Sequence, residues 1–352
     1  MSFRVLVIVL TGLLVLCVGL SLCAGAYDNL PPGDVLTGAL SVVGLGDGLA
    51  DPFAQGIVRL RTLRVLLAIG VGAALALSGA LLQGVFRNDL ASPGIIGISS
   101  GASLGAALAI LMLGGYGPRF VLEDAAGFGP IMVTACSFLG AMAIAWLVTS
   151  IATSNGRTSV PTLLLSGIAI NAVVGGTLSA IQHFALRDEH LAQALFGWLF
   201  GRLEDREPFQ VGMVWIGLLV SGLVIPLVAR ELDLFAGGEE DARGVGVDTQ
   251  RTKRVALVAA SFAAAVAVSV AGQIAFIGLV VPHVMRRLAG PRHRTLLPLC
   301  LIGGPVLLLG ADLIQRPFLG DDVLPPGVAM SLIGGVFFLG LLFRHRGRMD
   351  AW

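Results

Sequence analysis

Long apolar runs constrain this chain more than any other feature. Ten of them follow one another along 352 residues, and several exceed the roughly 20 residues that a helix needs to cross a bilayer. They lie at about 4–26, 57–84, 94–113, 129–152, 162–182, 211–230, 254–272, 274–285, 295–315 and 327–343. The pattern predicts an all-α polytopic membrane protein with about ten transmembrane helices in one domain, 1–352. The run at 274–285 is too short to span, so we expect irregular backbone there, buried inside the protein.

Composition agrees with a lipid environment. Hydrophobic residues make up 56% of the chain and charged residues only 13%, whereas soluble proteins carry about 25% charged residues. The 48 glycines suit helices whose backbones approach closely in a membrane. A net charge of +1 without basic runs argues against nucleic acid as a partner and leaves membrane lipid as the surroundings.

Basic residues indicate how the chain is oriented. Lys and Arg are retained in cytoplasmic segments. With the N-terminus inside and ten crossings, fifteen basic residues fall on the inner side and eight on the outer side. We therefore expect both termini in the cytoplasm. The first run is also long enough to span, so we expect it to be a retained helix rather than a cleaved signal peptide.

A short sequence echo suggests an internal repeat. The segment 61–65 reads RTLRV at the start of the second run, and 251–255 reads RTKRV at the start of the seventh. Five crossings separate the two copies, so they run in opposite directions through the membrane. This indicates an inverted repeat with halves at about 57–182 and 251–343, a common device of transporters.

Residues for chemistry are scarce. The four cysteines stand singly in apolar runs, without histidines at ligand spacing, so we expect no metal site. Lys253 is the single lysine, and it lies outside any glycine-rich loop of the kind that binds nucleotide phosphates. We expect neither a catalytic residue nor a cofactor of its own. Asp312 reads as a polar cap near the membrane interface rather than a proton relay.

Four motifs in order carry a family resemblance. The stretch 59–106 reads RLRTLRVLLAIGVGAALALSGALLQGVFRNDLASPGIIGISSGASLGA, and three further segments follow at 163–171, 196–201 and 272–283. Together they resemble the permease subunits of type II ABC importers for ferric siderophores, haem and cobalamin, which lie in the bacterial inner membrane. The resemblance implies two copies of the chain around one pathway, two cytoplasmic ATPase subunits that use the ATP, and a periplasmic binding protein. Gly97, Gly101 and Gly105 within the first motif recur every fourth residue and predict helix packing.

The segment 231–250 resembles the region through which the family contacts its ATPase. We expect a short polar helix there, flanked by glycines, that docks in a groove of the partner. A solvated loop is the alternative that composition alone favours. The residues of the predicted contact are Gly238, Glu239, Glu240, Asp241, Arg243, Gly244 and Gly246.

Arginines on the opposite face match the family's docking site for the binding protein. These are Arg59 and Arg61, with Arg316 joining them from the loop before the last span. A guanidinium binds a carboxylate through two parallel hydrogen bonds and steers an acidic partner. The alternative is that Arg59 and Arg61 only extend towards the interface at the start of a helix.

By the same resemblance, the fifth run and the segment after it line the pathway. The predicted residues are Asn171, Gly175, Gly176, Thr177, Ser179, His183, Arg187 and His190. Glycines leave room for a wide cargo, and few strong ligands favour its release. Asn171 has an alternative role as a hydrogen-bonded bridge between neighbouring helices.

The spacing of three predicted pathway residues narrowly favours one cargo over the others. On a continuing helix, His183, Arg187 and His190 share one face, where imidazole ligates haem iron and guanidinium pairs with propionates. We therefore favour haem over a ferric siderophore, with cobalamin third. The rival class is an ion-coupled secondary transporter, but almost every acidic residue lies in a loop or near a helix end. A membrane receptor or scaffold is weaker, because no extramembrane domain is evident.

Overall fold

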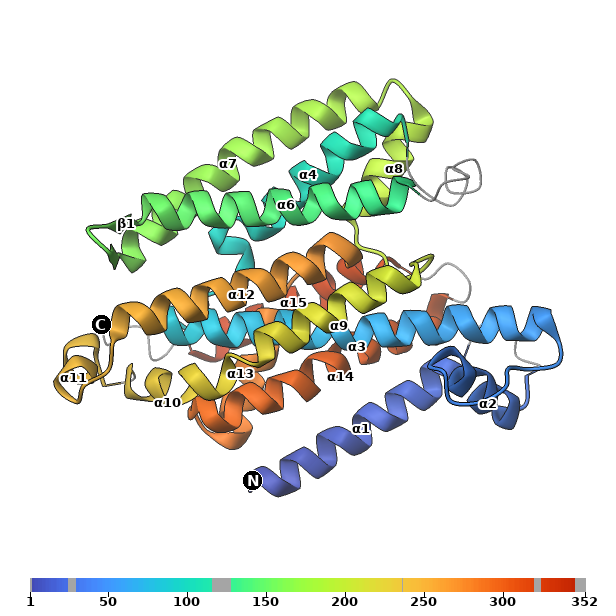
Figure 1. Ribbon diagram of the computed structural model, residues 1–352, viewed down its shortest axis with the longest axis horizontal. Helices are drawn as coiled ribbons and strands as arrows, with labels where there is room; N and C mark the ends of the chain where they lie inside the picture. Colours follow the sequence, from blue (N-terminus) through green and yellow to red (C-terminus); the bar gives the residue numbers. More distant parts are fainter. Residues whose placement is uncertain (1, 25–29, 116–127, 236, 320–323, 346–352) are drawn as a thin grey trace.

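The computed structural model describes residues 2–24, 30–115, 128–235, 237–319 and 324–345, with the side chains of 316–319, 342, 344 and 345 left out. Apart from one short hairpin, its elements are helices (Figure 1). In chain order they are α1 (Phe3–Cys23), α2 (Pro32–Val42), α3 (Pro52–Phe86), the 3-10 turn η1 (Pro93–Ile96), α4 (Ile98–Leu113), α6 (Phe128–Ile151), β1 (Thr153–Ser154), β2 (Arg157–Thr158), α7 (Val160–Ala185), α8 (Glu189–Leu199), α9 (Pro208–Gly222), α10 (Ile225–Phe235), α11 (Glu239–Gly244), α12 (Thr249–Ala271), α13 (Ile277–Ala289), α14 (His293–Leu319) and α15 (Pro326–His345).

The predicted all-α membrane fold is confirmed. A helix falls on each of the ten apolar runs. Within the described residues, six helices are long and apolar enough to cross a membrane, or seven if α9 and α10, bent by 53°, form one span. The helices on the remaining runs, α4, α13 and α15, are too short within the described residues to count as spans, so the total of ten crossings stays a prediction.

Helix α3 is the centre of the bundle. Its 35 residues correspond to about 52 Å, well above the roughly 30 Å hydrocarbon core of a bilayer. It begins five residues before the predicted run, because Asp51 accepts a hydrogen bond from the Phe53 N–H and Pro52 occupies the first turn. Helices α9, α12, α13 and α14 pack around it and bury most of its length.

Glycines let these helices touch backbone to backbone. A Cβ atom on Gly79 of α3 would lie 1.8 Å from the carbonyl oxygen of Gly278 in α13. The predicted packing role of the glycine strip on α4 is likewise confirmed, since a Cβ on Gly105 would lie 2.1 Å from the Cys136 carbonyl oxygen of α6. Such contacts give van der Waals packing where lipid offers no hydrophobic driving force.

Helices α3 and α12 run in opposite directions side by side (Figure 1), as an inverted repeat requires. The repeat itself stays a prediction. Between α12 and α13 the backbone is irregular from Gly272 to Phe276, which confirms the expected interruption of this run. Phe276 has a φ of 66°, a strained conformation for a non-glycine residue.

An ion-pair cluster joins elements at one end of the bundle. The Arg64 guanidinium of α3 lies 2.6 Å from the Asp312 carboxylate of α14 and 2.8 Å from the carboxylate of Glu204, which precedes α9. Asp312 is only 3% exposed. Since removing one partner leaves the other charge buried, the pair holds α3 and α14 together at this end of the bundle. Asp312 was expected to be a polar cap near the interface, and it is instead a buried residue paired with Arg64.

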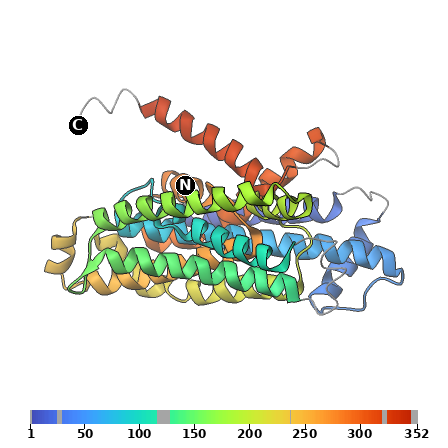
Figure 2. The same ribbon diagram turned by 90° about the horizontal axis from the view of Figure 1, so that it is seen from above.

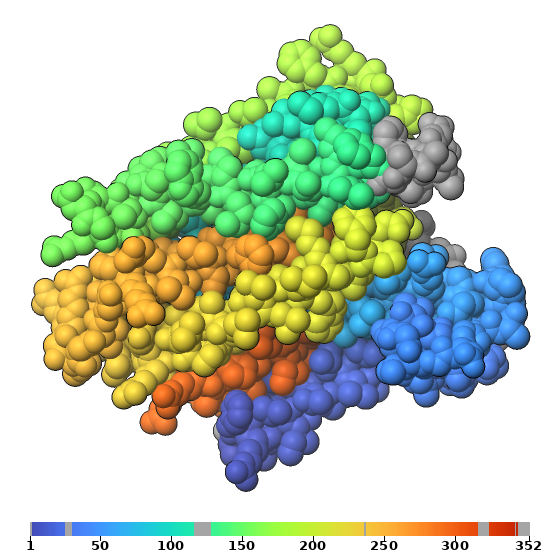
Figure 3. Space-filling model, in the orientation of Figure 1, coloured from blue at the N-terminus to red at the C-terminus, as the bar shows by residue number. Residues whose placement is uncertain are grey.

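Two faces of the bundle differ. On one face α6, α12, α9, α14 and α1 lie side by side (Figure 3). On the other, α15 leaves the bundle at an angle (Figure 2), and none of its described side chains after Gly334 is buried. Two short helices, α2 and α8, lie at the same end of the molecule and were absent from the predicted runs, because each is only 11 residues long.

The Gly79 contact gives a test of the packing. We expect Gly79→Ala to lower the thermal unfolding midpoint in detergent, by the equivalent of about 1–3 kcal/mol, because the backbone of α13 must move. Gly335→Ala is the matched control, since a Cβ there meets nothing within 4 Å. Equal midpoints for the two variants, measured by thermal shift of purified protein, would contradict this account.

Candidate functional site

The predicted functional residues lie in three places. Helix α11 and the β1–β2 hairpin occupy one end of the molecule, while the start of α3 lies at the other (Figure 1). Helix α7 runs between the ends at the edge of the bundle, where it packs against α4, α6 and η1. This separation matches a pathway with a different contact surface at each end.

Asn171 bridges α7 to its neighbours. Its Nδ2 donates to the Gly94 carbonyl oxygen of η1 at 2.9 Å, and its Oδ1 accepts from the Ser100 hydroxyl of α4 at 2.5 Å. Both ends of the amide are therefore satisfied within the chain. The alternative structural role of Asn171 is confirmed, and its contact with cargo stays a prediction.

The rest of the predicted pathway set on α7 forms a smooth, open surface. Gly176, Thr177 and Ser179 are exposed, and a Cβ on Gly175 or Gly176 would meet nothing within 4 Å. The Thr177 hydroxyl donates back to its own helix, to the Val173 carbonyl oxygen at 3.0 Å. This surface offers space and little polar attraction to a bulky molecule.

The predicted shared face of His183, Arg187 and His190 is wrong, because the helix does not continue. Helix α7 ends at Ala185, and the Asp188 side chain starts α8 by accepting from the backbone N–H groups of His190 and Leu191 at 2.9 and 3.2 Å. The acidic residue before a new apolar pattern is a helix-start signal that the sequence already carried.

Those three side chains are exposed around the break between the helices. The Arg187 guanidinium lies 5.6 Å from the centre of the Phe184 ring, within cation–π range. Across the described residues, no group of three His, Cys, Asp or Glu side chains is placed to hold a metal ion.

The predicted polar helix exists as α11. The preceding Gly238 has a φ of 132°, a conformation open to glycine, which allows the sharp entry into the helix. The predicted segment 231–250 is less of a loop than expected, because α10 extends to Phe235 and α12 begins at Thr249. Most of the predicted contact set is exposed, namely Glu240, Asp241, Arg243, Gly244 and Gly246, and the neighbouring Val245 is 68% exposed.

Glu239 differs from its neighbours, since its carboxylate is bound within the chain. Lys253 Nζ lies 2.6 Å from Oε2, while Arg243 Nη2 at 2.7 Å, Gln250 Nε2 at 2.9 Å and Thr249 Oγ1 at 3.2 Å donate to Oε1. Burial alone would raise the pKa of this carboxyl, but the Lys253 ammonium and the other donors outweigh it and hold the pKa below its usual range. Sequence reasoning missed this network, although the unique Lys253 was a signal.

The predicted docking arginines have different surroundings. Arg59 is exposed on the outer part of α3. Arg61 Nη1 donates to the carbonyl oxygens of Leu22 and Cys23 at 3.0 and 3.2 Å, so it caps the C-terminus of α1. Arg316 was expected in a loop, but α14 continues through it to Leu319, and its side chain lies outside the described part.

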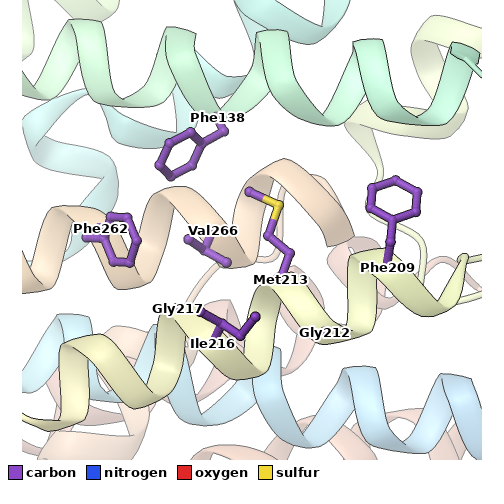
Figure 4. Close-up of a pocket in the computed structure, with 8 residues that line it drawn as sticks. All are labelled: Phe138, Phe209, Gly212, Met213, Ile216, Gly217, Phe262 and Val266. Carbon is purple, nitrogen blue, oxygen red and sulfur yellow. The ribbon is translucent and has the colours of Figure 1, made fainter.

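An apolar groove of about 580 Å³ opens between α6, α9 and α12 (Figure 4). Its lining has no charged or strongly polar side chain, and consists of Phe138, Phe209, Gly212, Met213, Ile216, Gly217, Phe262 and Val266. The helices that line it lie on the face of the bundle away from α15 (Figures 1 and 2), and the groove shares no residue with the predicted pathway. Its chemistry suits a hydrocarbon chain and excludes recognition of a charged chelate.

Six or seven helices long and apolar enough to cross a membrane, counted within the described residues, indicate a multi-pass membrane protein. Comparison with known families agrees, because the model of the FecCD transport family matches residues 13–344. The chain belongs to this family, and the resemblance seen in its sequence motifs is confirmed.

Curated relatives differ in the cargo that their names carry. A cobalamin import permease of Halobacterium salinarum is 41% identical over 82% of this chain and 74% of its own length. The hemin permease HmuU of Yersinia pestis is 39% identical, over 82% and 83%. The hydroxamate permease FhuG of Bacillus subtilis is 35% identical, over 83% and 87%.

A solved structure has the same fold. It is described as an inward-facing conformation of a metal-chelate type ABC transporter, and it superposes with a TM-score of 0.80. Sequence identity is 28%, and the match covers 97% of this chain and 99% of that chain. The similarity thus extends over nearly every element described above.

Protonation of Glu239 should release α11. Because its pKa is lowered in the folded protein, the stabilisation is complete above the usual glutamate pKa of about 4.3 and is lost as the pH falls through the folded value. We expect amide-exchange protection of α11, corrected for the intrinsic rate, to be constant between pH 8 and 5 and to fall in more acidic buffer. Glu239→Gln should flatten this dependence; an unchanged profile in that variant would assign the titration to another group.

Proposed function

We propose that this chain is the membrane-spanning subunit of an ATP-driven importer. Two copies form the pathway, two cytoplasmic ATP-binding subunits supply the energy, and a periplasmic substrate-binding protein delivers the cargo. The chain lies in the bacterial inner membrane with both termini in the cytoplasm. The observation that carries this proposal is the family match across residues 13–344, which spans both predicted contact surfaces.

Exposed apolar side chains on α7 and α15 support the second copy. Leu165 and Val173 of α7 are 69% and 71% exposed, and Val336 of α15 is 72% exposed. The first half of α15 packs on α13, α14 and the segment at Phe200, and its second half stands clear of the bundle (Figure 2). A second copy would cover part of this surface, and the open face of α7 would then border a pathway between the copies.

The cargo we propose is a bulky metal chelate, of the size of a corrinoid, a haem or a ferric siderophore. The smooth face of α7 supports weak binding of a wide molecule. The relatives described above are named for import of cobalamin, hemin and ferric hydroxamate, and all three compounds belong to this class. Haem remains one member of it, but the helix break at Asp188 removes the shared face that favoured it.

A secondary transporter is the alternative from another class. Such a protein needs an acid that exchanges ions or protons within the membrane. Asp312, the candidate, is paired to Arg64 at 2.6 Å near one end of the bundle. The ATP-driven reading therefore fits the described charges better.

Reconstituted uptake decides between these classes and among the cargoes. The chain would be placed in liposomes with its ATPase, and cobalamin, haem and a ferric hydroxamate would each be supplied on a matching binding protein. We expect uptake of one cargo that requires ATP and is indifferent to ionophores. Uptake that persists without ATP and collapses with an ionophore would overturn the proposal.

Docking of the binding protein should depend on Arg59. We expect Arg59→Glu to weaken binding of the partner at least tenfold, because a repelling carboxylate replaces an exposed cation, with unchanged thermal stability. Arg61→Glu should instead lower stability, since it removes the cap of α1. Binding is measured by titrating the purified binding protein onto the permease in nanodiscs. Unchanged binding by Arg59→Glu would remove this residue from the docking surface.

A further inference from the structure

One glutamine side chain connects two parts of the molecule that are distant in sequence. Gln250, in the first turn of α12, donates from Nε2 to Glu239 of α11 at 2.9 Å. Its Oε1 accepts from the backbone N–H of Thr158 in β2 at 3.0 Å. Because the amide has a donor end and an acceptor end, these two bonds fix its orientation and use both ends at once.

The α11 end of this bridge is firmly held. Glu239 also pairs with Lys253, which is almost buried, and Arg243 and Thr249 donate to the same carboxylate. Charge-assisted hydrogen bonds are shorter and stronger than neutral ones. A displacement of α11 would therefore move the Glu239 carboxylate and, through the hydrogen bond between them, the Gln250 side chain.

The other end of the bridge leads directly into α7. Thr158 pairs with Thr153 across the hairpin, and the Ser159 N–H donates to the Ala152 carbonyl oxygen at 3.0 Å. The next residue, Val160, begins α7, and the Ser159 hydroxyl accepts from the Thr162 N–H in its first turn. Only Ser159 separates the bonded Thr158 N–H from the start of α7. A movement of β2 is therefore expected to displace the start of α7 as well.

We propose that Gln250 is the positioning residue that transmits movement of α11 to the start of α7, and so links ATP hydrolysis in the partner to opening of the pathway. This inference rests on the proposed function. Gln250 contacts neither ATP nor cargo. Its two hydrogen bonds make α11 and the β1–β2 hairpin move together.

A second polar cluster at the same end does not provide this connection. Arg286 of α13 lies 2.7 Å from the Asp89 carboxylate and 2.5 Å from the Gln83 side-chain oxygen. These bonds join α13 to the end of α3 and the loop after it, and they include neither α11 nor the hairpin. Among the described side-chain hydrogen bonds, those that join α11 to the hairpin before α7 run through Gln250.

The test compares uptake with hydrolysis in proteoliposomes that hold the permease, its ATPase and the cargo-loaded binding protein. Gln250→Leu keeps a similar volume and removes both bonds. We expect ATP hydrolysis and ATPase binding to persist, while cargo molecules imported per ATP fall about tenfold, the size expected from losing a hydrogen bond to a charged group. Arg254→Leu is the control, because Arg254 is exposed on the same helix and its described side-chain bond goes to the Gln250 backbone oxygen.

A second variant gives an independent check. Gln250→Glu keeps the acceptor for the Thr158 N–H but places a carboxylate against Glu239 in place of the amide donor. We expect the number of cargo molecules imported per ATP to fall at least as far as in Gln250→Leu, while ATP hydrolysis and ATPase binding persist.

Each outcome has one meaning. A wild-type ratio in Gln250→Leu overturns the inference, and so does a parallel loss of uptake and hydrolysis, which indicates a merely structural role. If Gln250→Leu fails to fold, a wild-type ratio in Gln250→Glu overturns it. Absence of ATP-dependent uptake by the wild-type permease overturns the proposed function itself. Uptake by the wild type is therefore measured before that of any variant.

Discussion

Backbone contact between helices is the interaction on which the rest of this structure depends. Where Gly79 meets Gly278 there is no room for a side chain on either helix, so α3 and α13 sit closer than ordinary packing allows. Gly72 and Gly304 repeat this arrangement between α3 and α14. In lipid, where apolar side chains gain nothing by leaving the solvent, such close van der Waals packing is what holds helices together.

The sequence predicted the elements that follow from polarity and length. Ten apolar runs became helices, and the interruption before α13 fell where the run was too short to span. Glycine spacing on α4 predicted a packing strip that the structure confirms. These features are local, because each depends on residues within one or two turns of a helix, and local patterns can be read from one sequence.

What the sequence missed depends on contacts between distant residues. The Glu239 network joins a loop helix, the start of α12 and a hairpin about 90 residues earlier, and no spacing rule connects them. Arg61 is an exposed-looking cation in the sequence, yet it caps a helix that ended 38 residues before it. The break at Asp188 was visible as a capping signal, and it was overlooked because three side chains at helical spacing favoured a continuous helix.

The single lysine has a consequence for studying the assembled protein by chemical labelling. Lys253 is the only side-chain amine of the chain, and it is buried against the Glu239 carboxylate. An amine-reactive reagent applied to the complex will therefore modify the partners and leave this side chain unreacted while the ion pair holds. If α11 separates from α12 during the transport cycle, Lys253 becomes reactive at that moment. The chain thus carries an intrinsic probe whose modification rate reports the opening of one contact.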